Sequence, residues 1–274
     1  MSGQVLVTGA SGKTGKSLVG LLKDRGVPCR AATRGGEPAF DWTAPETWAA
    51  ALEDVASVYL VAPPTVDDPY SKMIEFLKVA TREGSRRFVF LGMASLPAGG
   101  PAHGQVHQWL KDNSDDWAVL APSAFMQNFA EGSHLATIRD EDRFYSNTGD
   151  GRVPFISADD IARAAFALLT GRATGEFVIT GGEAISYDQV AERIREACGR
   201  AISHARISTE ELVARFLKRG LPELTARFLA AGYETIAAGA HAQTTDVYSV
   251  LTGARPTTFE AFAEANAQVW RRAG

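Results

Sequence analysis

Residues 5–15 of the chain read VLVTGASGKTG, and this stretch decides the fold. An apolar run comes first, three glycines with the spacing G-x-x-G-x-x-G follow, and a segment with helical periodicity comes next. This order is typical of the first strand, turn and helix of a Rossmann-type fold. Gly9 permits a tight turn, Gly12 lets the backbone approach a pyrophosphate, and Gly15 allows the helix to pack closely on the strand.

The same turn predicts a dinucleotide site, because the amide groups and positive dipole end of a helix N-terminus stabilise phosphates. The alternative is a plain turn without a ligand. A P-loop is excluded, since the spacing from Gly9 to Lys13 is too short for G-x-x-x-x-G-K-[ST]. The candidate cofactor residues of the turn are Gly9, Ser11, Gly12, Lys13, Thr14 and Gly15.

Residues 29–36, which read CRAATRGG, indicate which dinucleotide binds. A Rossmann unit specific for NAD places Asp or Glu about 20 residues after the glycines, where it binds the ribose 2′-hydroxyl. Here Arg34 ends the strand, with Thr33 beside it. A guanidinium group pairs with the 2′-phosphate of NADP, whereas a carboxylate would repel it. Arg34, with Lys13 as a second positive charge, therefore favours NADP(H) over NAD(H). The alternative is that Arg34 is a solvated surface residue.

Short apolar runs alternate with longer segments of helical periodicity along the first two-thirds of the chain. This alternation indicates a parallel sheet covered on both faces, and right-handed crossovers give it a doubly wound order. The predicted strands are 5–8, 29–33, 57–62, 87–91, 117–121, 153–156 and 176–180, and the predicted helices are 14–24, 70–83, 125–131, 161–169, 186–198 and 259–272. We therefore predict an α/β fold, a Rossmann-type doubly wound parallel sheet with a small, mostly helical C-terminal substrate lobe.

The regular alternation of apolar runs with helical segments ends at about Pro122, and beyond Ser208 the chain is predicted to be mostly helical. Residues 143–151 are polar and contain glycines, so we expect a connection there. We predict an NADP-binding Rossmann domain over residues 1–155, to which parts of 156–180 contribute. Residues 181–274 would form a smaller, mainly helical lobe that binds or covers the substrate.

The composition is that of an ordinary globular protein, with 45% hydrophobic and 22% charged residues. A formal net charge of −4 gives no basic footprint for nucleic acid or an anionic membrane. No signal-peptide pattern and no apolar run of about 20 residues occurs, so we expect a cytoplasmic protein. We expect Cys29 and Cys198 to be reduced thiols, because two lone cysteines form no disulfide framework and neither has the spacing of a metal ligand. The expected partner is a small-molecule substrate, and the oligomeric state is left open.

Several further segments, taken together, resemble the NmrA-like family of atypical short-chain dehydrogenases/reductases. The resemblance covers nearly the whole chain and is carried by residues 9–15, 33–34, 40–42, 58–63, 121–129, 150–156, Asp160 and 251–259. Within the family the chain is most similar to the branch of ergot-alkaloid-type NADPH-dependent imine and iminium reductases, and reductases of quinone and azo-dye type are near. The resemblance implies an extended NADP-binding sheet with a small C-terminal substrate lobe.

The resemblance also implies where the cofactor lies. Three groups of residues would line it. Asp41 and Trp42 would lie by the adenine, and Ala62 and Pro63 would lie by the nicotinamide ribose. The nicotinamide would be lined by Gly92, Met93, Ala94, Pro122, Ser123 and Phe125. Ligands of such folds bind beyond the carboxyl ends of the strands, which independently favours these positions. The candidate substrate residues are Met93, Phe125, Met126 and Asn128. Core packing is the alternative for each apolar member.

The chain lacks the Tyr-x-x-x-Lys pair of ordinary members of the superfamily. The residues four positions after its six tyrosines are Pro63, Ile74, Gly149, Ala191, Ala237 and Thr252. Residues 103–110, where the corresponding helix belongs, read HGQVHQWL, and His103 falls near the lysine position. A histidine there can bind the ribose or supply a proton near neutral pH, so His103 is the candidate catalytic residue; a packing histidine is the alternative. His107 shares its helix face, but no third ligand is evident, so we expect no metal.

We therefore predict an NADPH-dependent oxidoreductase that transfers hydride to an imine or iminium, an activated C=C bond or a quinone-like acceptor. Such acceptors need little proton donation because no strongly basic alkoxide forms, so positioning over the nicotinamide supplies most of the catalysis. The alternative is a non-catalytic NADP(H)-binding redox sensor of the NmrA type, which the missing pair fits equally well. A nucleotide-sugar or flavonoid-type reductase is disfavoured, since those usually retain the tyrosine, the lysine or both.

Overall fold

The computed structural model describes residues 3–63 and 66–271, which form two compact units. The first unit comprises the described residues up to Pro122 together with Ala158–Ile179 and Val247–Ala254. The second unit comprises Ser123–Ser157, Thr180–Asp246 and the described residues from Arg255 onward. The chain therefore passes between the units several times, and neither unit is one continuous segment.

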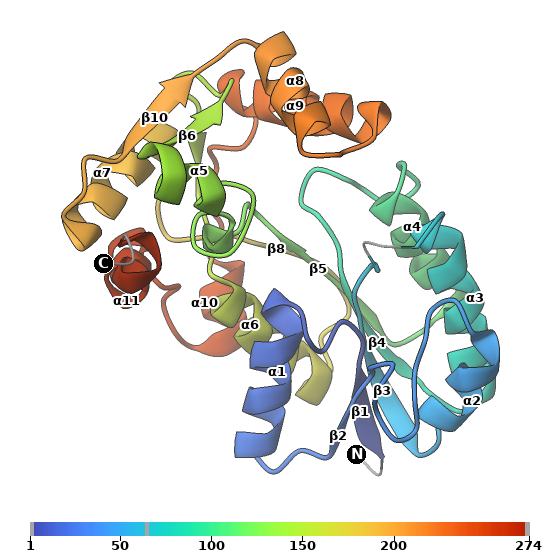
Figure 1. The fold of residues 1–274 in the computed structure, drawn as a ribbon. Helices are drawn as coiled ribbons and strands as arrows, with labels where there is room; N and C mark the ends of the chain where they lie inside the picture. The colour runs from blue at the N-terminus through green and yellow to red at the C-terminus, as the bar shows by residue number, and fades with distance from the viewer. Residues whose placement is uncertain (1–2, 64–65, 272–274) are drawn as a thin grey trace. The chain divides into compact units, whose positions relative to one another are not determined.

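Six parallel strands form the sheet of the first unit (Figure 1). They are β1 (Gln4–Val7), β2 (Cys29–Ala31), β3 (Val55–Leu60), β4 (Arg87–Leu91), β5 (Trp117–Pro122) and β8 (Gly175–Ile179). Their order is β2-β1-β3-β4-β5-β8, and every neighbouring pair is parallel. The order reverses between β1 and β3, and a switch point of this kind is where such sheets bind ligands. The predicted doubly wound sheet is confirmed.

Helices cover both faces of this sheet (Figure 1). One face carries α2 (Trp48–Ala51), which follows the 3-10 turn η1 (Pro45–Thr47), and also α3 (Pro69–Arg82) and α4 (His103–Asn113); the other carries α1 (Lys13–Asp24), α6 (Ala158–Thr170) and α10 (Val247–Thr252). Because both faces are covered, the central strands are mostly apolar, and their polar members Ser57 and Arg87 are buried. Phe76 of α3 and Phe90 of β4 are fully buried in one core cluster, and burial of each such side chain stabilises the fold by about 1.5–3 kcal/mol.

A buried arginine ties α6 to the sheet within the first unit. The guanidinium group of Arg87 donates to the carbonyl oxygens of Leu168, at 2.7 and 3.1 Å, and Ala173, at 2.6 Å. It also pairs with the carboxylate of Asp116. The side chain satisfies carbonyl groups at the C-terminal end of α6, which a helix leaves without intrahelical partners.

The second unit consists of helices and two small sheets. Its elements are η2 (Met126–Asn128), α5 (Leu135–Glu141), β6 (Arg143–Ser146), β7 (Arg152–Val153), β9 (Ile185–Ser186), α7 (Tyr187–Cys198), β10 (Ser203–Arg206), α8 (Thr209–Lys218), α9 (Glu223–Ala237) and α11 (Phe259–Trp270). The core is aromatic: Phe129 contacts the rings of Phe144, Phe155 and Tyr187. The indole nitrogen of Trp270 donates to the carbonyl oxygen of Phe129 at 2.8 Å, which fixes α11 on this core.

Two local predictions for the second unit are wrong, and the predicted strand 153–156 is confirmed only at its start, because β7 ends at Val153. Residues 143–151 are not simply a connection, because Arg143–Ser146 form β6, which pairs in parallel with β10. The predicted helix 125–131 is only the 3-10 turn η2. In both cases the deciding hydrogen bonds come from distant segments, as when the amide of Met126 donates to the carbonyl oxygen of Ile156 at 3.0 Å. The last residue of the predicted helix 259–272 lies outside the described residues.

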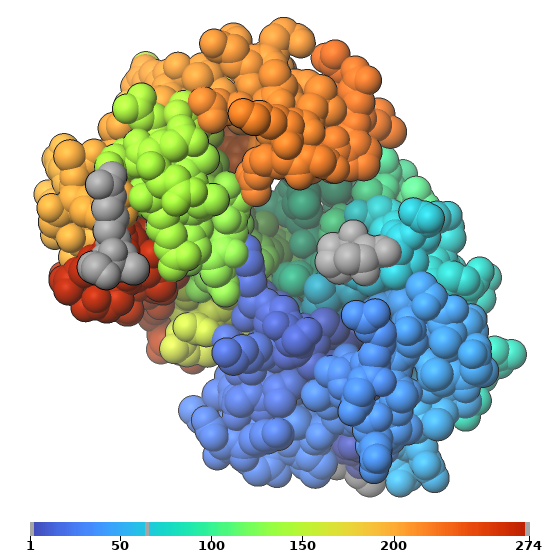
Figure 2. Space-filling model, viewed as in Figure 1, coloured from blue at the N-terminus to red at the C-terminus, as the bar shows by residue number. Residues whose placement is uncertain are grey.

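The division into units differs from the predicted boundary near residue 155. Residues 123–157 belong to the second unit and α10 belongs to the first, unlike the prediction, whereas α6 and β8 come from the segment 156–180 that was predicted to contribute to the first domain. The region beyond Ser208 is mostly helical, as predicted. In the second unit, α8 and α9 lie at the surface, where Figure 2 shows them in orange. Within residues 3–63 and 66–271, no helix is long and apolar enough to cross a membrane.

Candidate cofactor site

The glycine turn joins β1 to α1 at the carboxyl edge of the sheet. Gly9 has a φ of 61°, a left-handed conformation that favours glycine, and its carbonyl oxygen accepts a hydrogen bond of 2.8 Å from the amide of Gly12. Gly12 is the N-cap of α1, and the first turn of this helix carries no acidic residue and no side-chain cap. The start of α1 therefore presents backbone amides and no carboxylate, which suits a phosphate.

Gly12 and Gly15 are needed for different reasons. A Cβ on Gly15 would overlap the carbonyl oxygen of Gly9 and lie 2.9 Å from the Cα of Ala10, so this position requires glycine for the fold itself. A Cβ on Gly12 would meet a single protein atom, the carbonyl oxygen of Gly9, at 3.1 Å. Gly12 is exposed, and the space beside it is therefore open for a ligand.

Buried hydroxyl groups hold the turn against β3. Thr8 Oγ1 donates to the carbonyl oxygen of Tyr59 at 3.0 Å and accepts from the amide of Val61 at 2.8 Å. The phenol of Tyr59 donates to Thr14 Oγ1 at 3.1 Å, and burial raises the pKa of this phenol far above its usual value. Thr14 is thus a structural member of the predicted site, while Ser11 is exposed at the outside of the turn.

Arg34 is exposed just beyond β2, where the prediction places a 2′-phosphate. Asp41 lies near it: the backbone amide and hydroxyl of Thr43 donate to the carboxylate at 2.8 and 2.7 Å and lower its pKa, and the charge of Arg34 lowers it further. Trp42 stands edge-on to Phe40, with ring centroids 5.1 Å apart. The predicted adenine residues are therefore partly anchored in the core, with Asp41 beside the basic group.

Other predicted residues follow the carboxyl ends of the neighbouring strands. Ala62 and Pro63 come after β3, Gly92, Met93 and Ala94 follow β4, and Pro122 ends β5. A Cβ on Gly92 would lie 2.8 Å from Val119 Cγ1, so the chain leaves β4 in close contact with β5. The side chain of Met93 is 39% exposed, which is unusual for methionine. The fold thus brings these first-unit candidates to one edge of one sheet.

His103 begins α4 at the same edge and has a neighbour that the sequence did not indicate. Its Nδ1 atom lies 3.3 Å from the hydroxyl of Tyr70, near the start of α3. The imidazole stacks on Phe90 of β4 at 5.7 Å between centroids, and burial lowers the pKa of His103. Tyr70 was missed because α3 and α4 are separate helices, and only their packing brings the two side chains together.

The remaining candidates, Ser123, Phe125, Met126 and Asn128, belong to the second unit. Met126 is 2% exposed and lies in the aromatic core of this unit, which favours packing over a role in the substrate wall. The hydroxyl of Ser123 donates to the carbonyl oxygen of Pro154. Phe125 and Asn128 are half-buried and stay predicted substrate residues.

The second unit also holds a chain of Ser146, His204 and Asp188 that resembles a hydrolase triad. Ser146 Oγ lies 2.8 Å from His204 Nε2, and His204 Nδ1 lies 2.7 Å from Asp188 Oδ1. Ser146 is fully buried and also contacts the hydroxyl of Thr148 at 2.7 Å. A nucleophile without access to substrate cannot react, so the chain joins β6, β10 and α7 rather than forming an active site.

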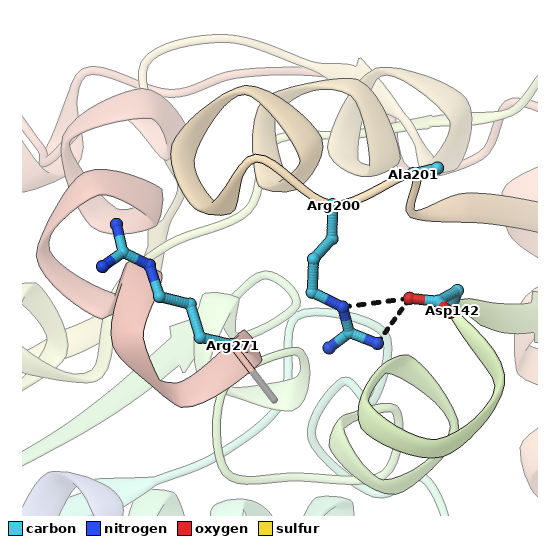
Figure 3. A pocket seen from close by; sticks show the side chains of 4 residues that line it. All are labelled: Asp142, Arg200, Ala201 and Arg271. Atoms are coloured by element: carbon cyan, nitrogen blue, oxygen red, sulfur yellow. Dashed lines mark hydrogen bonds and ion pairs between the residues drawn. The ribbon is translucent and has the colours of Figure 1, made fainter. Parts of the chain in front are cut away.

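Two surface hollows of this unit are lined by arginine side chains that join its elements. In the hollow shown in Figure 3, the guanidinium of Arg200 pairs with Asp142 and also donates to carbonyl oxygens of residues 138, 139 and 270. Between α5 and α8, the guanidinium of Arg215 lies over the ring of Tyr145 at 3.3 Å. Across the described ranges, no group of three or more His, Cys, Asp or Glu side chains is placed to hold a metal ion.

The doubly wound sheet and the glycine turn define a Rossmann-type protein of the dinucleotide-binding class. No family model matches the chain. The uncharacterized oxidoreductase YesF of Bacillus subtilis is 37% identical over 97% of this chain and 96% of its own length. The agroclavine dehydrogenase of Claviceps fusiformis is 36% identical over 97% of this chain and 98% of its own length.

A solved structure has the same fold. The solved triphenylmethane reductase of Citrobacter sp., complexed with NADP(H), superposes with a TM-score of 0.73 at 21% identity, over 96% of this chain and 99% of that one. This chain belongs to the NmrA-like family of atypical short-chain dehydrogenases/reductases, in the branch of the agroclavine dehydrogenases. The resemblance inferred from the sequence motifs is confirmed.

Proposed function

We propose that this protein is an NADPH-dependent oxidoreductase that reduces a small organic acceptor of the imine or iminium, activated C=C or quinone-like class. The observation that carries the proposal is the glycine turn, which presents backbone amides at the start of α1 with Arg34 exposed at the end of the next strand. The relatives of the chain support redox chemistry, since YesF is named an oxidoreductase and the Claviceps protein a dehydrogenase.

The residues of the first unit suit NADP(H). Amides of the first turn of α1 would bind the pyrophosphate, and the open space beside Gly12 leaves room for it. Arg34 would pair with the 2′-phosphate, a contact that NAD(H) lacks. The residues after β3 and β4, together with Pro122 at the end of β5, would hold the nicotinamide end. Bound NADPH supplies a hydride, and the protein supplies position and an electrostatic surrounding.

His103 suits a hydrogen-bonding role better than an acid role at neutral pH. Burial lowers its pKa, so the ring is neutral at pH 7 and carries one N–H group. That group would hold the nicotinamide ribose or orient the acceptor. An iminium acceptor fits such a site, because hydride addition completes its reduction without a proton. A ketone acceptor would need a stronger acid than a neutral imidazole.

The surface of the second unit supports an apolar substrate. Leu224 and Phe228, one turn apart on α9, are 84% and 53% exposed. Exposed apolar side chains of this size commonly mark binding surfaces.

The test is a titration with NADPH and NADH followed by an acceptor screen. The absorbance of reduced nicotinamide would be followed with a cyclic iminium ion, an enone, a quinone and a ketone, with Gly12→Val as the control that lacks cofactor binding. We expect NADPH to be oxidised with one of the first three and more slowly with the ketone. Tight binding that distinguishes oxidised from reduced cofactor, without turnover of any acceptor, would instead identify a redox sensor.

A further inference from the structure

Tyr70 and His103 join the first turns of α3 and α4 at the carboxyl edge of the sheet, through the 3.3 Å contact between the Tyr70 hydroxyl and His103 Nδ1. We infer that Tyr70 is a positioning residue: its hydroxyl donates to Nδ1 of His103 and keeps the imidazole proton on Nε2, where it serves the cofactor ribose or the acceptor. This role in the reaction rests on the proposed function, whereas the tautomer itself does not.

The direction of the hydrogen bond follows from the partners of both groups. Within residues 3–63 and 66–271, His103 Nδ1 is the one hydrogen-bond partner of the Tyr70 hydroxyl. If the hydroxyl accepted from an Nδ1–H group, its own hydrogen would have no acceptor among the described residues. A donating hydroxyl satisfies the phenol and the ring nitrogen together, which is the arrangement that half-buried polar groups adopt. Burial raises the pKa of Tyr70 and lowers that of His103, so the phenol keeps its proton and the ring stays neutral.

The ring of His103 is also held on two sides. Phe90 lies nearly parallel to it, at 22° between planes, and the ring of Tyr70 lies 5.1 Å from it, between centroids, at 57°. Stacking on Phe90 fixes the plane of the imidazole, but it leaves open which nitrogen carries the proton. The hydroxyl of Tyr70 supplies that missing constraint. A residue whose partner sets its tautomer is pre-organised for one hydrogen-bond acceptor.

The first experiment measures the tautomer directly, without cofactor or substrate. Protein labelled with ¹⁵N-histidine is examined by NMR, and the His103 signals are assigned as those that His103→Gln removes. We expect the proton of wild-type His103 on Nε2, and an increased share of the Nδ1–H form in Tyr70→Phe, which keeps the ring and loses the donor. A wild-type proton on Nδ1, or an unchanged ratio in the variant, overturns the inference. The wild-type measurement decides even if the variant does not fold.

The second experiment asks whether Tyr70 acts through His103. We expect Tyr70→Phe to lower kcat/KM by about five- to tenfold, the scale of one hydrogen bond. Tyr70→Phe combined with His103→Ala should be no slower than His103→Ala alone. Tyr145→Phe, which removes a tyrosine hydroxyl that donates to Glu141 in the second unit, is the matched control. Multiplied losses in the double variant overturn the inference. Failure of the wild type to bind NADPH would overturn the proposed function and leave the tautomer result standing.

Discussion

The carbonyl oxygen of Gly9 occupies the position that a Cβ on Gly15 would need. The backbone of α1 therefore approaches the end of β1 closely enough to exclude every side chain at position 15. Gly12, three residues earlier, has no such conflict beyond the contact of 3.1 Å with the same oxygen. One turn thus contains a glycine required by the fold and a glycine whose open side suits a ligand.

This difference predicts opposite outcomes for two substitutions. Gly15→Ala should destabilise the fold by about 2 kcal/mol or more, because overpacking must push α1 from β1. Gly12→Val should leave the melting temperature close to that of the wild type and abolish NADPH binding, because the branched side chain fills the space beside the first turn of α1. Thermal denaturation and NADPH titration of both variants check this. Normal NADPH affinity in Gly12→Val would place the cofactor elsewhere.

We expect Arg34 to determine the preference for NADPH over NADH. Arg34→Asp should weaken NADPH binding by about 1.5–3 kcal/mol, the scale of a charge-assisted contact that is lost. NADH affinity should change little or improve, since a carboxylate there can accept from the ribose 2′-hydroxyl. Arg30→Asp is an unsuitable control, because Arg30 donates to the carbonyl oxygen of Ala51 at 2.6 Å. Arg82→Asp, on the exposed end of α3, is a better one. Equal affinity of the wild type for NADPH and NADH would remove this role of Arg34.

The protonation state of His103 leads to a prediction of how the rate of reduction depends on the acceptor and on pH. If the imidazolium ion were the acid, the rate would fall as pH rises through its pKa, which burial places below the usual value of about 6.5. We expect no such fall between pH 6.5 and 8, because the neutral ring acts there by hydrogen bonding. His103→Ala should then reduce NADPH affinity and slow enone or ketone reduction more than iminium reduction. Unchanged activity at limiting and saturating NADPH would show a packing role alone.

We expect the buried His134 to make the folding stability of the protein fall at acidic pH. Burial, with a smaller effect of the Arg219 charge, lowers the pKa of His134 to about 3. The unfolded chain takes up a proton at this residue near pH 6.5 while the folded chain does not, so stability is lost as pH falls below that value. The slope is about 1.4 kcal/mol per pH unit. The lowered pKa values of His103, His107 and His204 act in the same direction.

The check is chemical denaturation of the wild type and of His134→Phe between pH 6.5 and 5. Phenylalanine keeps the stacking on Phe129, whose ring centroid lies 4.9 Å from that of His134, and cannot take up a proton. We expect the variant to lose distinctly less stability over this interval than the wild type. An identical slope in the two proteins would mean that His134 does not resist protonation in the folded state.

Most errors of the sequence interpretation lie in the second unit. The strand β6 was missed because its four residues pair with β10, about 60 positions along the chain, and a segment of four residues is too short to show a periodicity of its own. Met126, predicted as a substrate residue from its place in a family motif, lies in the aromatic core, which favours packing, and its role in the site stays a prediction. Neither fact has a local signal, since both depend on which distant segments come together.

The sequence by itself determined the first unit. Apolar strands alternate with amphipathic helices there, each strand is followed by the helix that covers it, and the glycine turn marks where the sheet binds a ligand. These patterns are local, so they can be read along the chain. The tertiary structure alone decided the contact between Tyr70 and His103, the pairing of β6 with β10, and the return of α10 to the first unit. Such contacts join residues that are distant in sequence, and their free energy comes from packing that no single segment encodes.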